Sequence, residues 1–188
     1  MSIVVKKELI IWILPIIGGI VTIIALFVPV AFTKNFDRFF FFGYRVFESP
    51  APNDISFMKG TGLILSIIVS ILLLISAIIA ILYGVKGFGK KHGYSRLVIL
   101  ISGTVILFST ILFTIGIDAF TLSYEEMVQS FELDKYFDWD IYDPSIGLIL
   151  SYIGGILILE SAILDFFHPT KIREDSSSNL PFHSNQDA

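Results

Sequence analysis

The chain has 188 residues, of which 54% are hydrophobic and only 16% are charged, and its formal net charge is −4. A soluble domain carries about 25% charged residues, so this composition excludes an ordinary water-soluble protein. The chain has no cysteine, so disulfides, thiolate metal sites and cysteine nucleophiles are also excluded.

The apolar residues gather in four blocks, each long enough to cross about 30 Å of hydrocarbon as a helix. These blocks cover residues 9–32, 62–83, 97–117 and 145–167. We therefore predict an all-α membrane protein whose domain, residues 1–167, is a bundle of four transmembrane helices. Segments 33–61 and 118–144 are expected to be exterior loops. The polar residues 168–188 are expected to form a disordered cytoplasmic tail.

Basic residues predict the orientation of the bundle. The N-terminus, the connection after the second block and the start of the tail carry 8 of the 13 basic residues, whereas the two long loops carry 11 of the 17 acidic residues. By the positive-inside rule, both termini face the cytoplasm and the long loops face outward. We expect a multi-pass protein of the plasma membrane.

The first block contains a proline and a patch of small residues. Pro15 lacks an N–H and would leave the carbonyl of Ile11 unpaired, which predicts a kink. Gly18 and Gly19 follow within one turn. Small residues let helix backbones approach closely in lipid, so this patch predicts a helix-packing surface.

The first exterior loop is aromatic, and its centre holds Phe39, Phe40, Phe41, Phe42 and Tyr44. Its composition is strand-like, although the apolar residues do not alternate strictly. Two interpretations stay open. The aromatic side chains lie on the outer headgroups and the helix ends, or they form an exterior docking surface for a partner protein.

The second exterior loop is acidic, with Asp138, Asp140 and Asp143 within six residues. Hard cations prefer such oxygen clusters, so the loop is either a cation site without EF-hand spacing or a solvated acidic surface. The spacing Ser123-x-x-Glu126 predicts a capping box that starts a short amphipathic helix. Asp143 and the proline after it are expected to be the N-cap and first residue of the fourth helix.

The fourth block carries a ladder of small residues. Gly147, Ser151 and Gly155 are four residues apart, and Gly154 widens the ladder. We expect this face to pack closely, either within the bundle or against a second copy of the chain. Asp165, near the end of the block, is interpreted as an interfacial residue.

Residues 147–163 repeat residues 62–78, with 12 of 17 positions identical. The tripeptide Ala-Phe-Thr also recurs, at residues 31–33 and 119–121. This repetition predicts two similar helical hairpins in parallel.

The two copies of the repeat differ at one notable position, where an isoleucine in the first copy corresponds to Glu160 in the second. Glu160 lies about 10 Å inside the cytoplasmic end at 1.5 Å per residue. Acids at that depth usually face the bundle or a wet cavity. Glu160 is therefore either a proton or cation site, or a structural acid that is neutral or paired with Lys7, Lys86 or Arg96.

The layout of four spans, internal termini and two outer loops resembles that of small tetraspan proteins such as claudins and tetraspanins. The chain has neither the W-GLW motif and paired cysteines of claudins nor the CCG motif of tetraspanins. No functional residue is therefore transferred from either group.

The sequence contains no Ser/His/Asp constellation and no metal-ligand motif, so we expect neither an enzyme nor a cofactor. It favours a structural, scaffold or accessory subunit that acts through helix packing and its exterior loops. The expected partners are the lipid bilayer and either further copies of the chain or other membrane proteins, without nucleic acid. The alternative is a small channel or transporter that uses Glu160.

Overall fold

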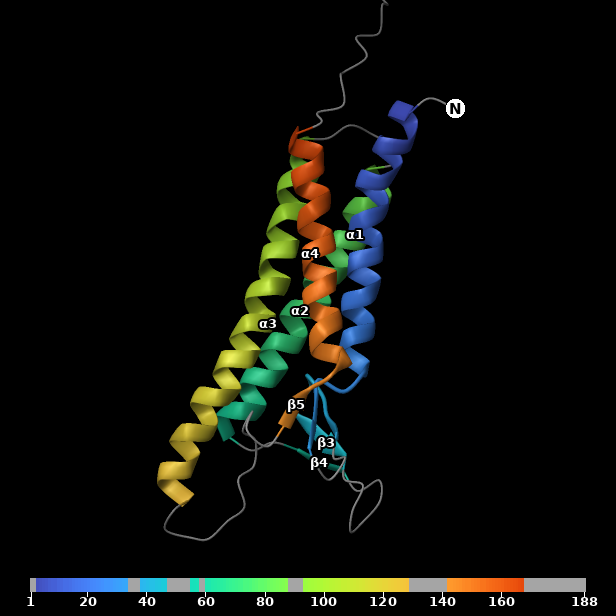
Figure 1. Cartoon of the computed structure of the whole chain (residues 1–188). Helices are drawn as coiled ribbons and strands as arrows, with labels where there is room; N and C mark the ends of the chain where they lie inside the picture. The colour runs from blue at the N-terminus through green and yellow to red at the C-terminus, as the bar shows by residue number, and fades with distance from the viewer. Residues whose placement is uncertain are drawn as a thin grey trace, which may run out of the picture.

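The computed structural model describes residues 3–33, 38–46, 55–57, 60–87, 93–128 and 142–167. Four helices lie side by side in a bundle (Figure 1): α1 (Ile3–Phe27), α2 (Gly60–Gly87), α3 (Gly93–Val128) and α4 (Ile146–Phe167). A small sheet lies at one end of the bundle, opposite the end where α1 begins and α4 ends. The fold is mostly helical, and the sheet corrects the all-α prediction.

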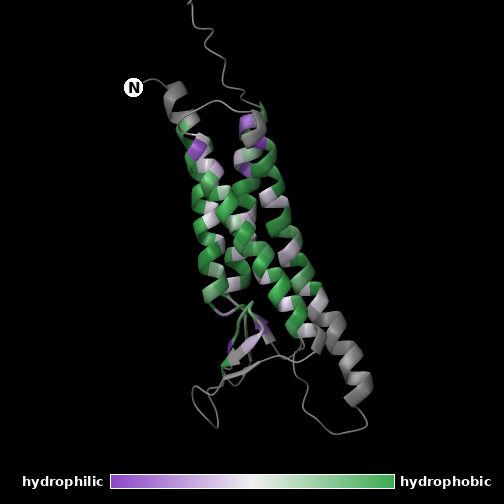
Figure 2. Cartoon of the chain, turned by 180° about the vertical axis from the view of Figure 1, so that it is seen from behind, coloured by the Kyte–Doolittle hydropathy of each residue, from purple (hydrophilic) through white to green (hydrophobic). Residues whose placement is uncertain are grey.

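Each of the four helices contains a stretch long and apolar enough to cross a membrane: Leu9–Phe27, Gly62–Gly87, Arg96–Gly116 and Ile146–Phe167. Figure 2 shows that hydrophobic residues cover the described parts of the bundle, with the hydrophilic ones concentrated towards its ends and in the sheet. The architecture is therefore that of a multi-pass membrane protein with four spans.

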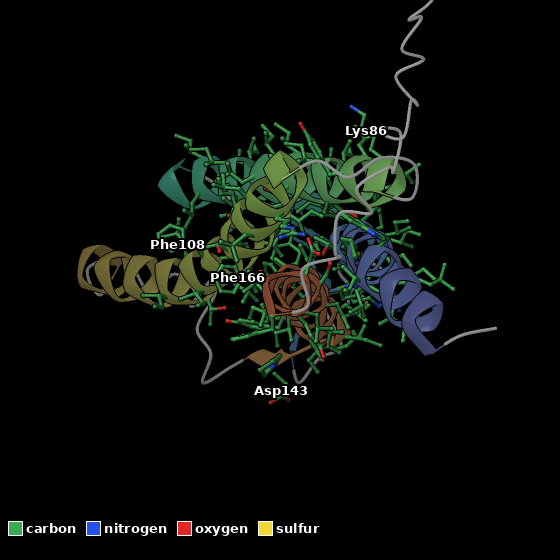
Figure 3. The ribbon with its side chains drawn as sticks, turned by 90° about the horizontal axis from the view of Figure 1, so that it is seen from above. Lys86, Phe108, Asp143 and Phe166 are labelled. Carbon is green, nitrogen blue, oxygen red and sulfur yellow. The ribbon has the colours of Figure 1, made fainter. Side chains whose placement is uncertain are left out.

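The helices occupy the four corners of the bundle when it is seen from its end (Figure 3). Helices α1 and α3 each pack against both α2 and α4. Fully buried side chains such as Leu26, Leu73, Ile106 and Ile158 fill the space between the helices. Isoleucines dominate the outward faces, where lipid tails replace water as the solvent.

Two helix ends differ from the predicted boundaries. Helix α1 ends at Phe27 rather than at residue 32, because Pro29 disfavours a helical backbone at the residue before it. Helix α3 continues to Val128, although a loop was expected from residue 118 and a new helix at Ser123. No glycine or proline lies between residues 117 and 128, so no residue there breaks the helical hydrogen bonds. The prediction that a capping box at Ser123 and Glu126 starts a new helix is therefore wrong.

The sheet has five antiparallel strands in the order β4–β3–β2–β1–β5. They are β1 (Ala31–Thr33), β2 (Arg38–Phe39), β3 (Tyr44–Val46), β4 (Ile55–Phe57) and β5 (Tyr142–Pro144). Strand β1 follows α1 and strand β5 precedes α4, so their pairing joins the segment after the first helix to the segment before the fourth. The repeated tripeptide does not keep its structure, because residues 31–33 form β1 whereas residues 119–121 belong to α3.

The start of α4 differs from the sequence interpretation. Asp143 and Pro144 belong to β5 rather than to the helix. The carbonyl of Ser145 accepts the first helical hydrogen bonds, from the N–H groups of Leu148 at 3.1 Å and Ile149 at 3.3 Å. Pairing with β1 holds the preceding residues extended, so Ser145 takes the N-cap position.

Strands β2 and β3 form a hairpin whose turn contains Phe41 and Phe42. The N–H of Gly43 donates to the carbonyl of Phe40 at 2.9 Å, and the N–H of Phe40 donates to the carbonyl of Tyr44 at 3.1 Å. Gly43 has a φ of 74°, the left-handed conformation that three-residue hairpin loops require of this position. The strand-like composition of the loop corresponds to this hairpin.

Candidate functional site

Helix α4 carries two acidic residues within its span, and the structure places them on opposite faces. Asp165 is only 3% exposed and points into the bundle. Glu160 lies on the exposed face of the helix. The difference follows from the rotation of α4 about its own axis, which turns Gly154 towards α1 and Gly155 towards α3.

Asp165 forms an ion pair with Arg96 of α3, with 2.5 Å between Oδ2 and Nε. The side chain of Asp165 is 4% exposed and that of Arg96 is 35% exposed. The cation of Arg96 therefore lies in direct contact with the buried carboxylate of Asp165. The pair links α3 to α4 at the end of the bundle opposite the sheet.

Asp165, which the sequence places near the membrane interface, is buried between the helices rather than exposed at the helix end. The sequence contained a signal for this. The positions 147, 151, 154, 158, 161 and 165 alternate in steps of four and three, and all six are buried. The small-residue ladder therefore continues to Asp165, whereas Glu160 lies off it.

Glu160 makes no ion pair with the two described cations that the sequence suggested. Lys86 lies over the ring of Tyr83, with Nζ 5.4 Å from its centroid, and points away from the bundle (Figure 3). Arg96 contacts Asp165. The side chain of Lys7 lies outside the described residues. Glu160 is therefore an exposed acid on the lipid-facing side of α4.

The predicted helix-packing residues lie at contacts within the bundle. Gly18 of α1 and Gly154 of α4 face each other so closely that a Cβ on either would lie 2.7 Å from the carbonyl oxygen of the other. Gly19 faces α2, where a Cβ would lie 2.8 Å from the carbonyl oxygen of Ala77.

The remaining three packing residues are also buried. A Cβ on Gly147 would lie 2.6 Å from the carbonyl oxygen of Pro29. A Cβ on Gly155 would lie 2.6 Å from a methyl group of Leu107 on α3. Ser151 is fully buried and donates to the carbonyl of Leu148. The sequence left two possibilities open for this face, packing within the bundle or against a second copy of the chain. In the structure, these residues pack within the bundle.

The carbonyl that Pro15 leaves free has a partner on another helix. The hydroxyl of Ser161 on α4 donates to the carbonyl of Ile11 on α1 at 2.6 Å. Other buried hydroxyls, such as those of Thr22 and Thr110, donate to the carbonyl four residues earlier in their own helix. Ser161 therefore donates the hydrogen bond that Pro15, which has no N–H, cannot donate to this carbonyl.

The hairpin between β2 and β3 packs against the end of the bundle. Phe41 is fully buried, and its ring centroid lies 4.8 Å from that of Phe113 on α3. Phe39 is 3% exposed. These two residues therefore do not contribute to the exposed docking surface that the sequence suggested.

The other three aromatic residues of that predicted surface are half-buried. Phe40 and Tyr44 stack with their centroids 4.4 Å apart, and burial raises the pKa of the Tyr44 hydroxyl. Phe42 lies beside Phe27 at the end of α1, with 6.0 Å between the centroids. The hairpin thus uses its aromatic side chains largely to cover the helix ends.

The predicted cation cluster is described only in part. Asp143 is exposed on the edge strand β5 (Figure 3), and Asp138 and Asp140 lie outside the described residues. Within the described part of the chain, no group of three metal-ligating side chains is present.

The chain was compared with models of known protein families and with characterised proteins, and neither comparison found a match. The functional hypotheses therefore depend on the geometry of the bundle and its surfaces.

Proposed function

We propose that the chain is a non-enzymatic accessory or scaffold subunit of a membrane protein complex, and that it acts through its outer surface. The observation that supports this proposal is the position of Glu160 on the outside of the bundle. An intramembrane acid usually faces protein or water, and on this surface a partner molecule would supply that environment.

The packing of the interior supports the same proposal. The contacts at Gly18, Gly19, Gly147 and Gly154 bring helix backbones together without room for a methyl group. The hairpin buries Phe41 at one end of the bundle. A bundle closed in this way is suited to support a partner rather than to enclose a substrate.

A small channel or transporter is the second candidate, and the buried Asp165 is the observation in its favour. Asp165 lies inside the bundle, but it is held by Arg96. Glu160 does not line a path between these four helices. A transport function would therefore require either opening of the Arg96–Asp165 pair or a second subunit facing Glu160.

Ion flux separates the two candidates. The purified chain is reconstituted in liposomes containing a pH-sensitive dye, and proton and cation flux are measured with Glu160→Gln as the matched variant. We expect the flux to equal that of protein-free liposomes for both forms. A flux that Glu160→Gln abolishes would contradict the accessory role and support transport.

We also propose that the bundle arose by duplication of a helical hairpin and that both termini face the cytoplasm of the plasma membrane. The duplication is supported by the pattern of buried residues, which is closely similar in α2 and α4. Ser66, Leu73 and Ser76 of α2 are buried, and so are Ser151, Ile158 and Ser161 at the corresponding positions of α4. Both helices therefore present the same face to the centre of the bundle.

A further inference from the structure

Helices α2 and α4 present the same outward stripe except at one residue. On α2 the stripe consists of Ile64, Ile68, Ile71, Ile75 and Ile78, which are 42–58% exposed. On α4 the corresponding residues are Ile149, Ile153, Ile156, Glu160 and Ile163; the four isoleucines are 43–54% exposed, and Glu160 also belongs to the exposed class. The α2 stripe is therefore an internal reference for an ordinary lipid-facing surface.

The carboxylate of Glu160 distinguishes the α4 stripe from the α2 stripe, which is entirely apolar. Glu160 has too short a side chain to reach the headgroups from about 10 Å inside the span, at 1.5 Å per residue. An acid facing hydrocarbon at this depth carries a large desolvation penalty. A basic side chain at the same depth would remove most of that penalty by forming an ion pair.

This chain does not supply such a basic side chain from its described spans. Within the four spans, the only basic residues are Lys86 and Arg96, and both lie at span ends. Lys86 contacts Tyr83, and Arg96 contacts Asp165. The described spans of a second copy placed against α4 would likewise offer Glu160 no basic side chain away from the span ends.

We infer that the stripe of Ile149, Ile153, Ile156, Glu160 and Ile163 docks a transmembrane helix of a different protein, and that this helix carries a lysine or arginine opposite Glu160. The inference rests on the proposed accessory role and names the chemistry of the partner. The isoleucines suit such an interface, because their χ1 angles are already restricted in a helix and lose little freedom on packing. Charge complementarity at Glu160 sets the depth and register of the partner.

Site-specific photocrosslinking in native membranes tests the inference on the full-length chain. A photoreactive amino acid replaces Ile153 or Ile156 on α4, and Ile68 or Ile71 on α2 in the matched controls. We expect adducts with one other membrane protein from the α4 positions and none from the α2 positions. Mass spectrometry of the adduct should identify a transmembrane segment with a lysine or arginine within one turn of the crosslinked position.

Charge variants then test the role of Glu160 itself. We expect Glu160→Gln and Glu160→Ile to lower the adduct yield about fivefold or more, and Glu160→Asp to retain most of it. The Glu160→Lys variant should lose the adduct and regain it when the basic residue of the partner is changed to glutamate. Because Glu160 is exposed, all four variants should elute as the native chain does in detergent.

Several results would overturn the inference. They are equal adducts from both stripes, an adduct with a second copy, a partner segment without a basic residue, and an unchanged yield for Glu160→Gln. If crosslinks form only from the sheet or from another helix, the accessory role stands and the inference fails. If the chain is a lone monomer without adducts anywhere in native membranes, both fail.

Discussion

Pro15 and Ser161 are a pair in which one residue removes a hydrogen bond and the other restores it. The hydroxyl of Ser161 donates to the carbonyl of Ile11, 2.6 Å away on the neighbouring helix. We expect Ser161→Ala to lower the free energy of unfolding by about 1 kcal/mol, since the carbonyl then has no donor in a lipid environment. Equilibrium unfolding in mixed micelles measures the change.

The same measurement in a Pro15→Ala background provides the control. Alanine at position 15 supplies an N–H that can reach the carbonyl of Ile11. Ser161→Ala should therefore have a much smaller effect in this background. The effect of Ser102→Ala should not depend on residue 15, because Ser102 donates within its own helix to Val98. An equal loss for Ser161→Ala in both backgrounds would contradict this account.

The Arg96–Asp165 pair should respond unequally to loss of its two members. Removing Arg96 leaves a carboxylate that is only 4% exposed without its cation, whereas removing Asp165 leaves an arginine that is 35% exposed and can turn towards the headgroups. We expect Arg96→Ala to destabilise the bundle by about 3 kcal/mol and Asp165→Ala to have a clearly smaller effect. Unfolding of both variants and of the double variant measures this.

The double variant decides whether the buried charge is the cause. It should be more stable than Arg96→Ala alone, because the second substitution removes the unpaired carboxylate. Alanine is also the residue that α2 carries at the corresponding position, Ala80, which is fully buried. Additive losses in the double variant would show that packing rather than charge determines both effects.

At the scale of helices, the contact between α1 and α4 depends on glycine. A Cβ on Gly154 would lie 2.7 Å from the backbone oxygen of Gly18 and closer still to the hydroxyl of Thr22. On Gly116 of α3, the three atoms nearest to a Cβ all belong to the side chain of Leu65, and the nearest, a methyl group at its end, would lie at 2.5 Å. A side-chain end can move aside, whereas a helix backbone can move only with its helix.

We therefore expect Gly154→Ala to separate α1 from α4 and to destabilise the bundle by about 2 kcal/mol. Gly116→Ala, the matched control, should cost less than about 1 kcal/mol. Thermal unfolding in detergent, followed by circular dichroism, compares the two variants. Equal melting temperatures for both variants would show that the close approach of α1 and α4 contributes little to stability.

The helices could be predicted from the sequence, because about 20 consecutive apolar residues in lipid have few alternatives to a spanning helix. Their boundaries depended on single residues. Pro29 ended α1 early, and the absence of a breaker let α3 run to Val128. The β1–β5 pairing joins residues more than 100 positions apart, and no local pattern predicts a pairing of that separation.

The candidate site could be predicted only in part, for a different physical reason. The depth of an acid follows from counting residues, but the direction of its side chain depends on the rotation of the helix. That rotation follows from which stripe of α4 packs inward. The buried residues Gly154, Ile158, Ser161 and Asp165 form that stripe, and Glu160 is left on the other side. Reading the full stripe, rather than the glycines alone, would have distinguished the two acids.

At the scale of the whole molecule, the sheet and the Arg96–Asp165 pair lie at opposite ends of the four spans. The positive-inside rule predicts that the end with Lys86 and Arg96 faces the cytoplasm and that the sheet faces outward. Since the chain has no cysteine, single cysteines can report each side without background. Asp143 and Lys86 are suitable positions, because both are exposed in the structure.

We expect a membrane-impermeant maleimide to label Asp143→Cys in intact cells and to label Lys86→Cys only after the membrane is permeabilised. Leu73→Cys, at a fully buried position in the middle of α2, should react in neither case and should become reactive on denaturation. The opposite labelling of the two exposed positions would invert the orientation. Labelling of both in intact cells would place the two ends of the bundle on the same side, which a spanning α2 does not allow.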